Sequence, residues 1–355
     1  MKYEFIGRLK IILLFFGISL IFLSGCDLNK PVDKLRAERA INNKACINVA
    51  VVWPFASEYA TFSKGIDLAS DEINLSGGVL GRRINLIKKD DESSVTKGMI
   101  IADELSADLD VAAVIGHYDS YVTIPASNIY NAGGILLINP ASTSPNYNKN
   151  GYDLLFRTVA NGTEIAARLI DLIKANGCGK IMICYVRNDY GLSLANAAED
   201  NCNKNSISVV DRKSYLVGTP QEFKSITEQW KQFEYDCILF FGDVNYGPNF
   251  IKSIREEGIS APIVCGDAMN SPKLMEAAGK YSENVILPAF FSHSSSDAAA
   301  REFERKFRLK FGIEPDSWAA LGYDSLTLFA RAVKKAGSPE PRKIAEAMRT
   351  FKNER

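Results

Sequence analysis

Hydroxyl groups gather in two loops, each of which follows a predicted strand, over residues 111–116 and 135–139. The residues concerned are Ser120 in the first loop, and Ala141, Ser142 and Thr143 in the second. A loop that leads into a helix also presents free backbone N–H groups, so both loops could hold an anion such as a carboxylate. The alternative is that Ser120 and Thr143 only cap the helices that follow.

Acidic and aromatic side chains follow the predicted strands in the second half of the chain. Asp267 comes after a strand over residues 262–266, Tyr190 after one over residues 180–186, and Asp243 stands at the end of a third. A carboxylate in such a place could pair with an ammonium group through a charge-assisted hydrogen bond. Aspartate is also a good helix cap, which is the alternative. Hydroxyls in one half and a carboxylate in the other suit the two poles of a zwitterion.

Strand-like and helix-like segments alternate along the chain and would position these loops. Strands are predicted over residues 47–53, 83–88, 111–116, 135–139, 180–186, 208–213, 237–242, 262–266 and 285–290. Helices are predicted over residues 61–74, 95–107, 124–132, 165–175, 192–203, 222–233, 249–257, 272–278 and 298–311. Strands separated by helices of about 10–15 residues predict an α/β fold, with parallel sheets covered by helices on both faces.

The alternation falls into two blocks, about 47–157 and 161–286. One open sheet of so many strands would be unusual, so two lobes are predicted. We expect an N-terminal lobe of residues 46–158 and about 290–340, and a C-terminal lobe of residues 159–289. A chain that crosses between lobes more than once suits a hinge and a cleft. Ligands in such folds bind beyond the carboxyl ends of the strands.

The N-terminus resembles that of a bacterial lipoprotein. A positively charged start is followed by an uncharged run over residues 11–23, which closes in the motif LSGC ending at Cys26. The run is too short to span a bilayer, which takes about 20 apolar residues, and fits a signal-peptide core. We predict a signal peptide over residues 1–25, a lipid on Cys26 and a tether over residues 26–45. The alternative is an uncleaved anchor with an incidental cysteine.

This reading places the rest of the chain in the cell envelope, attached to the membrane by lipid and on the periplasmic face if the cell is Gram-negative. Asp27, directly after the lipidated cysteine, resembles an inner-membrane retention signal of Gram-negative bacteria. Lysine plus arginine and aspartate plus glutamate number 42 each, so no overall field favours nucleic acid as a partner.

Signatures of enzymes and metal sites are weak. The chain has two histidines, of which His117 is interpreted as structural, and it has no serine in a G-x-S-x-G motif. The glycine-rich run over residues 77–81 follows a helix and precedes a strand, the reverse of the order in a dinucleotide-binding fingerprint. The acidic run over residues 90–92 is interpreted as a solvated loop. We therefore predict no enzyme activity, no cofactor and no metal.

The seven cysteines have different predicted roles. Cys184, Cys237 and Cys265 lie in apolar strand-like runs and are predicted to be buried. Cys178 and Cys202 flank one strand–helix unit and could form a disulfide in an oxidising compartment, although sequence alone cannot fix the pairing.

Several motifs lie in or beside the predicted loops. They are INLSGGVLG over residues 73–81, VIGH over 114–117, PAS over 125–127, NPASTSP over 139–145, FRT over 156–158 and NDYG over 188–191. Their order and spacing, from about residue 47 to about residue 337, resemble those of type I solute-binding proteins of branched-chain amino acid ABC transporters. The resemblance implies a two-lobed periplasmic-binding-protein-like type I fold that closes on an amino acid and delivers it to a membrane permease.

The resemblance also implies roles for particular residues. The ligand carboxylate is expected at Ser120 and at the loop of Ala141, Ser142 and Thr143. The ammonium group is expected at Asp267, with Tyr190 as the aromatic neighbour, and Tyr59 is expected to cover the side-chain pocket. The protein would act as a monomer, with an amino acid and an ABC permease as its partners.

The chain departs from the family's pattern at three places. The first loop, over residues 52–59, reads VWPFASEY where a small Gly/Ser-rich turn is usual, and Asp119 and Tyr121 bring charge and bulk beside Ser120. Residues 341–355 are interpreted as a shortened C-terminal segment.

An alternative hypothesis is that the protein is an envelope lipoprotein that uses the same fold to regulate or contact a protein partner. Failure to bind any small solute would favour this alternative.

Overall fold

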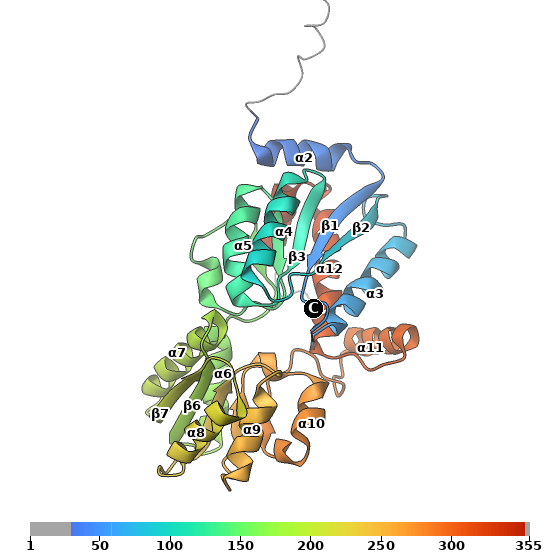
Figure 1. Ribbon diagram of the computed structural model, residues 1–355. Helices are drawn as coiled ribbons and strands as arrows, with labels where there is room; N and C mark the ends of the chain where they lie inside the picture. The colour runs from blue at the N-terminus through green and yellow to red at the C-terminus, as the bar shows by residue number, and fades with distance from the viewer. Residues whose placement is uncertain (1–29, 58, 352–355) are drawn as a thin grey trace, which may run out of the picture.

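A computed structural model describes residues 30–57 and 59–351 and shows two α/β lobes placed end to end (Figure 1). The predicted signal peptide and Cys26 lie outside the described residues. Within the described part, no helix is both long and apolar enough to cross a membrane. The two-lobed α/β architecture confirms the predicted fold class.

Each lobe contains a parallel five-stranded sheet. In the N-terminal lobe the order is β2-β1-β3-β4-β5, with β1 Cys46–Val52, β2 Arg83–Lys89, β3 Val111–Gly116, β4 Leu136–Asn139 and β5 Leu155–Arg157. In the C-terminal lobe the order is β10-β9-β8-β6-β7, with β6 Lys180–Val186, β7 Ser208–Tyr215, β8 Cys237–Phe241, β9 Ile263–Cys265 and β10 Val285–Ile286. Read from β2 and from β7, the two orders are the same.

Helices cover both faces of each sheet. The helices of the described residues are α2 Val32–Asn42, α3 Thr61–Leu75, α4 Val95–Ala107, α5 Ser120–Ala132, α6 Gly162–Ala175, α7 Asp189–Lys204, α8 Pro220–Trp230, α9 Gly247–Glu256, α10 Pro272–Ala278, α11 Ala298–Phe311, α12 Ser317–Ala336 and α13 Pro341–Arg349. The same residues include short 3₁₀ turns: η1 Pro145–Asn148, η2 Asp267–Met269 and η3 Gly279–Ser282. The central strands β3 and β8 are buried along their whole length, which explains their continuous apolar sequences.

Strand register brings the functional loops together. Val52 at the end of β1 pairs with Gly116 at the end of β3, so the loops after these two strands open at the same level. In the other lobe Tyr185 pairs with Phe241, and β9 runs alongside β8. In both lobes the loops after the first and third strands flank the point where the chain reverses its direction of winding, and this is where open α/β sheets bind ligands.

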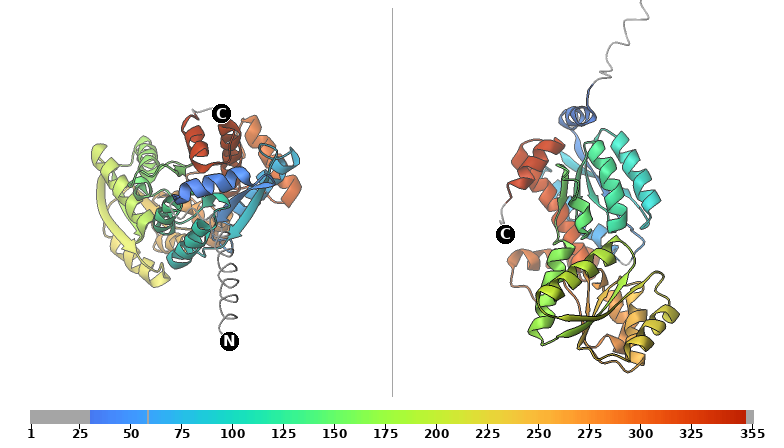
Figure 2. Two further views of the ribbon diagram at one scale, coloured as in Figure 1. Left: turned by 90° about the horizontal axis from the view of Figure 1, so that it is seen from above. Right: turned by 90° about the vertical axis from the view of Figure 1, so that its left-hand side faces the viewer.

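The last helices return to the N-terminal lobe, where α12 packs against α3 (Figures 1 and 2). Two glycines allow the close approach of the two helices. A Cβ on Gly65 would lie 1.9 Å from the carbonyl oxygen of Ala319, and a Cβ on Gly322 would lie 2.3 Å from that of Phe62. The helix α12 was not among the helices predicted from sequence. The exact lobe boundaries given above remain a prediction.

The N-terminal segment differs from the predicted tether. Residues 32–42 form the three-turn helix α2, which lies across the end of the N-terminal lobe that points away from the other lobe (Figures 1 and 2). Arg36 is fully buried and donates hydrogen bonds of 2.6–2.8 Å to the carbonyl oxygens of Ser106, Asp108, Val111 and Gly133. Burial lowers the pKa of Arg36 to about 10, which leaves the guanidinium charged at neutral pH. Arg36 is therefore the buried contact that docks the segment, and Arg82 and Arg342 add hydrogen bonds to it at the surface.

Candidate functional site

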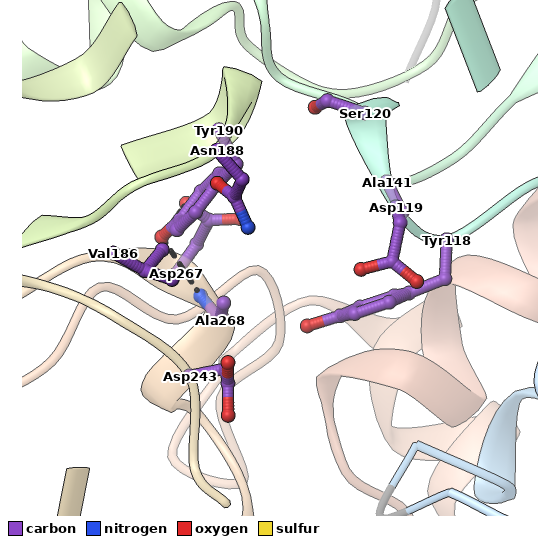
Figure 3. Close-up of a pocket in the computed structure, with 10 residues that line it drawn as sticks. All are labelled: Tyr118, Asp119, Ser120, Ala141, Val186, Asn188, Tyr190, Asp243, Asp267 and Ala268. Carbon is purple, nitrogen blue, oxygen red and sulfur yellow. Dashed lines mark hydrogen bonds between the residues drawn. The ribbon is translucent and has the colours of Figure 1, made fainter. Parts of the chain in front are cut away.

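A cavity lies between the strand ends of the two lobes (Figure 3). Ten residues line it: Tyr118, Asp119, Ser120 and Ala141 from the N-terminal lobe, and Val186, Asn188, Tyr190, Asp243, Asp267 and Ala268 from the C-terminal lobe. The cavity itself measures about 30 Å³, and about 380 Å³ when the space up to its open mouth is included. The site is therefore narrow in this state, and a ligand larger than water must enter with movement of the lobes.

The N-terminal wall is held in place by Asn139 at the end of β4. Its side-chain amide donates to the carbonyl oxygens of Gly116 and His117, both at 2.9 Å. Its side-chain oxygen accepts from the backbone N–H groups of Ala141 at 3.1 Å and Ser142 at 2.6 Å. One buried side chain thus ties the loop after β3 to the loop after β4, and the two hydroxyl loops meet as the sequence predicted.

The hydroxyl of Ser120 joins the same network. Ser142 Oγ donates to Ser120 Oγ at 3.0 Å, and the backbone N–H of Ser144 donates to it at 3.4 Å. Ser120 is the first residue of α5, and its side chain is 2% exposed. The helix begins four residues earlier than predicted. Ser120 therefore sits at a helix N-terminus that faces the cavity, a position that favours negative charge.

Asp119 precedes α5 at the N-cap position but does not cap the helix with its side chain. Its carboxylate points into the cavity (Figure 3), and its Oδ2 is buried without a hydrogen-bond partner among the described residues. Burial is the main cause that raises the pKa of Asp119 to about 7; the charges of Asp91 and Asp243 act in the same direction, and hydrogen bonds with Ser93 and Tyr121 oppose the rise. One oxygen of this buried acid is therefore left without a hydrogen-bond partner among the described residues.

Asp267 and Tyr190 form the C-terminal wall. Asp267 begins η2 and is 2% exposed, and its Oδ1 accepts a 3.2 Å hydrogen bond from the hydroxyl of Tyr190. The same hydroxyl accepts a 3.3 Å hydrogen bond from the backbone N–H of Ala268. Burial raises the pKa of Asp267 to about 6, and hydrogen bonds from its own backbone N–H and from Tyr190 oppose this rise. The carboxylate is therefore ionised at neutral pH and oriented by one tyrosine.

Asp243 follows β8 on the same side of the cavity. Its Oδ1 accepts a 2.8 Å hydrogen bond from the backbone N–H of Asn245, which closes a local turn. Burial raises the pKa of its carboxyl group. The half-buried carboxylate lines the cavity together with Asn188, the residue that caps α7.

Aromatic rings close the cavity on the N-terminal side. The rings of Tyr59 and Tyr118 stack with centroids 4.1 Å apart, and Trp318 meets both edge-on. The Tyr59 hydroxyl donates a 3.0 Å hydrogen bond to the carbonyl oxygen of Ala268, and Trp318 Nε1 donates a 2.8 Å hydrogen bond to that of Asn270. Both bonds cross from one lobe to the other and hold the two walls together.

The structure brings four of the predicted ligand-binding residues to the cavity: Ser120, Ala141, Tyr190 and Asp267. Ser142, Thr143 and Tyr59 are buried behind the lining and do not reach it in this state. The sequence analysis named Asp243 as a possible partner of an ammonium group and Asp119 as a neighbour of Ser120, but it did not assign either to the site. It also did not assign the other four lining residues: Tyr118, Val186, Asn188 and Ala268. Asp119, Asn188 and Asp243 stand at strand ends in the sequence, which is a usable signal, whereas Tyr118, Val186 and Ala268 gave none.

His117 and Asp91 form a buried pair beneath the N-terminal wall. His117 Nδ1 lies 2.6 Å from Asp91 Oδ2, and its Nε2 lies 3.1 Å from the hydroxyl oxygen of Tyr130. Asp91 is 1% exposed. The interpretation of residues 90–92 as a solvated loop was therefore wrong for Asp91, because its partner lies 26 positions away in the sequence.

Among the described residues, the donor atoms of His293, Glu304 and Glu314 come close enough together to hold a cation. Arg308 already binds both acids, with hydrogen bonds of 2.5 Å to Glu304 and 2.6 Å to Glu314. The group is thus an ion-pair cluster around Arg308 at the end of α11.

Every cysteine in the described part of the chain is free. The Cys178–Cys202 disulfide considered from the sequence is not formed. Cys202 is buried in the core of the C-terminal lobe, while the thiol of Cys178 is in hydrogen-bond contact with that of Cys237. Cys184, Cys237 and Cys265 are buried, as predicted.

Two lobes of the same topology, with a small cavity between their strand ends, define a bilobed α/β solute-binding protein. The chain belongs to the periplasmic binding protein family, whose sequence profile matches residues 46–354. It is 31% identical over 307 residues to Leu/Ile/Val-binding protein homolog 1 of Brucella abortus, an alignment that covers 85% of this chain and 81% of the relative. These relatives are solute-binding proteins and not enzymes, and the chain is placed in the same class.

Solved structures agree with this assignment. An ABC transporter substrate-binding protein from Desulfitobacterium hafniense, also solved in complex with Leu, is 34% identical, with a TM-score of 0.76 and coverage of 85% of this chain and 88% of that one. A branched-chain amino acid transporter substrate-binding protein from Streptococcus pneumoniae, in complex with isoleucine, is 25% identical, with a TM-score of 0.77 and coverage of 85% and 87%.

Proposed function

We propose that this chain is the extracytoplasmic substrate-binding protein of an ABC importer and that it binds an α-amino acid between its lobes. One observation carries the proposal: Ser120 at a helix N-terminus and the buried Asp267 line opposite walls of the same cavity. An α-amino acid is a zwitterion, and its two charged groups require partners of these two kinds.

The carboxylate of the ligand would lie at Ser120 and the N-terminus of α5. The hydroxyl and the positive end of the helix both favour an anion there. Ala141 lines the same wall, and Ser142 and Thr143 support it from behind. Since the backbone N–H of Ala141 is engaged by Asn139, a ligand that used this group would replace an existing hydrogen bond.

The ammonium group of the ligand would lie at Asp267. A charge-assisted hydrogen bond in a desolvated site is stronger than a neutral one. Tyr190 orients the carboxylate, and Tyr59 bridges the lobes through its hydrogen bond to Ala268. The complexes of similar proteins with Leu and isoleucine support an amino acid as the ligand.

Ligand binding would favour closure because the ligand contacts both lobes. The crossings between the lobes after β5 and after β10 are two connecting segments, which suits a hinge. The closed form would be the one recognised by a membrane permease, and the protein would act as a monomer.

The proposal includes a lipid anchor at Cys26, after cleavage of a signal peptide over residues 1–25. Expression in bacteria of Cys26→Ala should release the protein from the membrane fraction, while Cys46→Ala should leave it there. Membrane retention of the Cys26 variant would contradict the anchor without affecting the ligand site.

The function is tested first by calorimetric titration with the twenty standard amino acids. Asp267→Ala should weaken the best ligand by about 1.5–3 kcal/mol, roughly 10- to 150-fold. The matched control is Asp171→Ala, which removes an exposed carboxylate from α6 far from the cavity. Binding of no amino acid by a folded protein would overturn the proposal and favour a lipoprotein that contacts a protein partner.

A further inference from the structure

Three carboxylates line the cavity: Asp119, Asp243 and Asp267. None of the ten described lining residues is a lysine, arginine or histidine. A cluster of acids needs a compensating positive charge when water is removed, because buried unpaired carboxylates are costly. The lining thus has more negative charge than a neutral zwitterion can offset.

Asp119 is the carboxylate whose position is hardest to explain by structure alone. An aspartate at an N-cap normally accepts a backbone N–H of the helix, but the side chain of Asp119 does not. Instead its Oδ2 is buried without a partner and points into the cavity (Figure 3). The hydroxyl of Tyr118, a residue 9% exposed, points into the same space and likewise makes no hydrogen bond within the described residues.

Asp243 faces this pair from the other lobe. Figure 3 shows Ser120 at one end of the cavity, with Asp119 and Tyr118 on one wall and Asp243 across from them at the end away from Ser120. The proximity of the two acids is reflected in the pKa of Asp119, which the charge of Asp243 raises. The two carboxylates therefore flank the space that remains once an α-carboxylate occupies the Ser120 end.

The charges of an α-amino acid leave these two acids unpaired. Its single ammonium group is taken by Asp267, the acid beside Tyr190. An aliphatic side chain would then desolvate Asp119 and Asp243 without giving either a partner. A second cation on the ligand would pair with both, and it would also give the Tyr118 hydroxyl a polar neighbour.

We propose that the ligand is an α-amino acid with a cationic side chain, whose second positive group lies between Asp119 and Asp243. This inference rests on the proposed function and names its substrate class. The α-carboxylate remains at Ser120 and the α-ammonium group at Asp267. The side chain extends along the wall formed by Tyr118, and the lobes move apart to admit it.

The experiment is a calorimetric comparison of L-lysine, L-ornithine, L-leucine, L-isoleucine and 1,5-diaminopentane with the purified protein at pH 8. We expect lysine or ornithine to bind at least tenfold more tightly than either aliphatic amino acid. The diamine, which lacks the carboxylate, should bind at least tenfold more weakly than lysine.

Two variants test whether Asp119 and Asp243 cause the preference for lysine over leucine. Asp119→Asn and Asp243→Asn should each reduce the ratio of lysine to leucine affinity at least tenfold. Asp171→Asn, which makes the same change in net charge on an exposed helix, should leave the ratio unchanged. Retained affinity for leucine in the asparagine variants would show that they are folded.

Each contrary result has a distinct meaning. If leucine or isoleucine binds as tightly as lysine, the inference is overturned while the amino-acid receptor stands. If the diamine matches lysine, the amino-acid class is wrong and the inference falls with it. If nothing in the panel binds to folded protein, the inference is overturned, and binding or non-binding of the remaining standard amino acids decides the proposed function.

Discussion

The two lobes share one topology and differ in what they bring to the cavity. Their sheets have the same strand order, and the loops after equivalent strands meet at the site. The N-terminal lobe supplies hydroxyls that already bond to one another, at Ser120 and Ser142. The C-terminal lobe supplies two carboxylates, the half-buried Asp243 and the buried Asp267. The shared fold therefore places the ligand between the strand ends, and the side chains of the loops determine which charged groups on a ligand can be bound.

The difference between the lobes is clearest at Asp119 and Asp243, because both residues follow the third strand of their lobe. Asp243 accepts a hydrogen bond from the N–H of Asn245 and closes its own loop. Asp119 caps nothing, and one of its oxygens has no partner within the described structure. Both acids line the cavity, but Asp243 also closes a turn in its own loop, whereas one oxygen of Asp119 has no hydrogen-bond partner among the described residues.

The largest expected effect concerns the N-terminal lobe, which α2 secures through Arg36. Arg36→Met should leave several buried carbonyl oxygens unpaired and lower the free energy of unfolding by about 2–4 kcal/mol. Urea denaturation measures this loss. The control Arg39→Met changes an exposed arginine on the same helix and should shift stability by less than about 0.5 kcal/mol. Equal effects would mean that α2 is a loose tether after all.

The next largest effect concerns the pH dependence of stability, in which Asp119 and Asp243 should differ. The pKa of Asp119 is about 7 in the folded state, above that of an unfolded aspartate, so the folded protein binds the extra proton between about pH 4 and 7. Stability should therefore fall as pH rises through this window. Asp119→Asn should raise the unfolding free energy at pH 8 by on the order of 1–3 kcal/mol, and by much less at pH 5.

The matched variant for this experiment is Asp243→Asn. It removes a carboxylate that already has a partner in its own turn, so we expect no comparable gain in stability at pH 8. Urea titrations of both variants at the two pH values give the comparison. A gain of the same size in both variants would show that the two acids are equally unpaired.

A smaller effect tests the C-terminal wall. Because the pKa of Asp267 is about 6, affinity for an ammonium ligand should fall as pH drops below 6 and the carboxyl group takes up a proton. Tyr190→Phe removes one of the hydrogen bonds that oppose this rise, so the fall should begin at higher pH, and affinity at pH 7 should drop by about 1 kcal/mol. Titrations from pH 5 to 8 measure both changes, with Tyr152→Phe as the control. An unshifted profile would remove Tyr190 from the ammonium site.

The smallest effect concerns the contact between the lobes. Tyr59→Phe removes the hydrogen bond to the carbonyl oxygen of Ala268 and should shift the balance towards open forms by about 0.5–1.5 kcal/mol. Small-angle scattering of the ligand-free protein should then show a larger radius of gyration. An unchanged curve would mean that the contact between Trp318 and Asn270 holds the lobes without Tyr59.

Much of the fold could be predicted from local sequence patterns. The buried strands β3 and β8 are continuous apolar runs, and most helices lie within a few residues of the predicted ranges. The helix α12 was missed, although it is 20 residues long. Its first six residues, Ser317–Gly322 in sequence, are all buried, so the one-sided apolar stripe that indicates a surface helix is absent there.

The sequence by itself determined the alternation of strands and helices, the hydroxyl and acidic loops at the strand ends, and four of the residues that line the cavity. These follow from neighbouring residues, because periodicity and turn chemistry are local. The tertiary structure alone decided that Arg36 docks α2 through partners at least 70 positions away, and that Tyr59 bonds a carbonyl 209 positions away. It also left one oxygen of Asp119 without a hydrogen-bond partner among the described residues. Such contacts depend on how the helices and strands pack against one another, and they cannot be predicted from the pattern of neighbouring residues in the sequence.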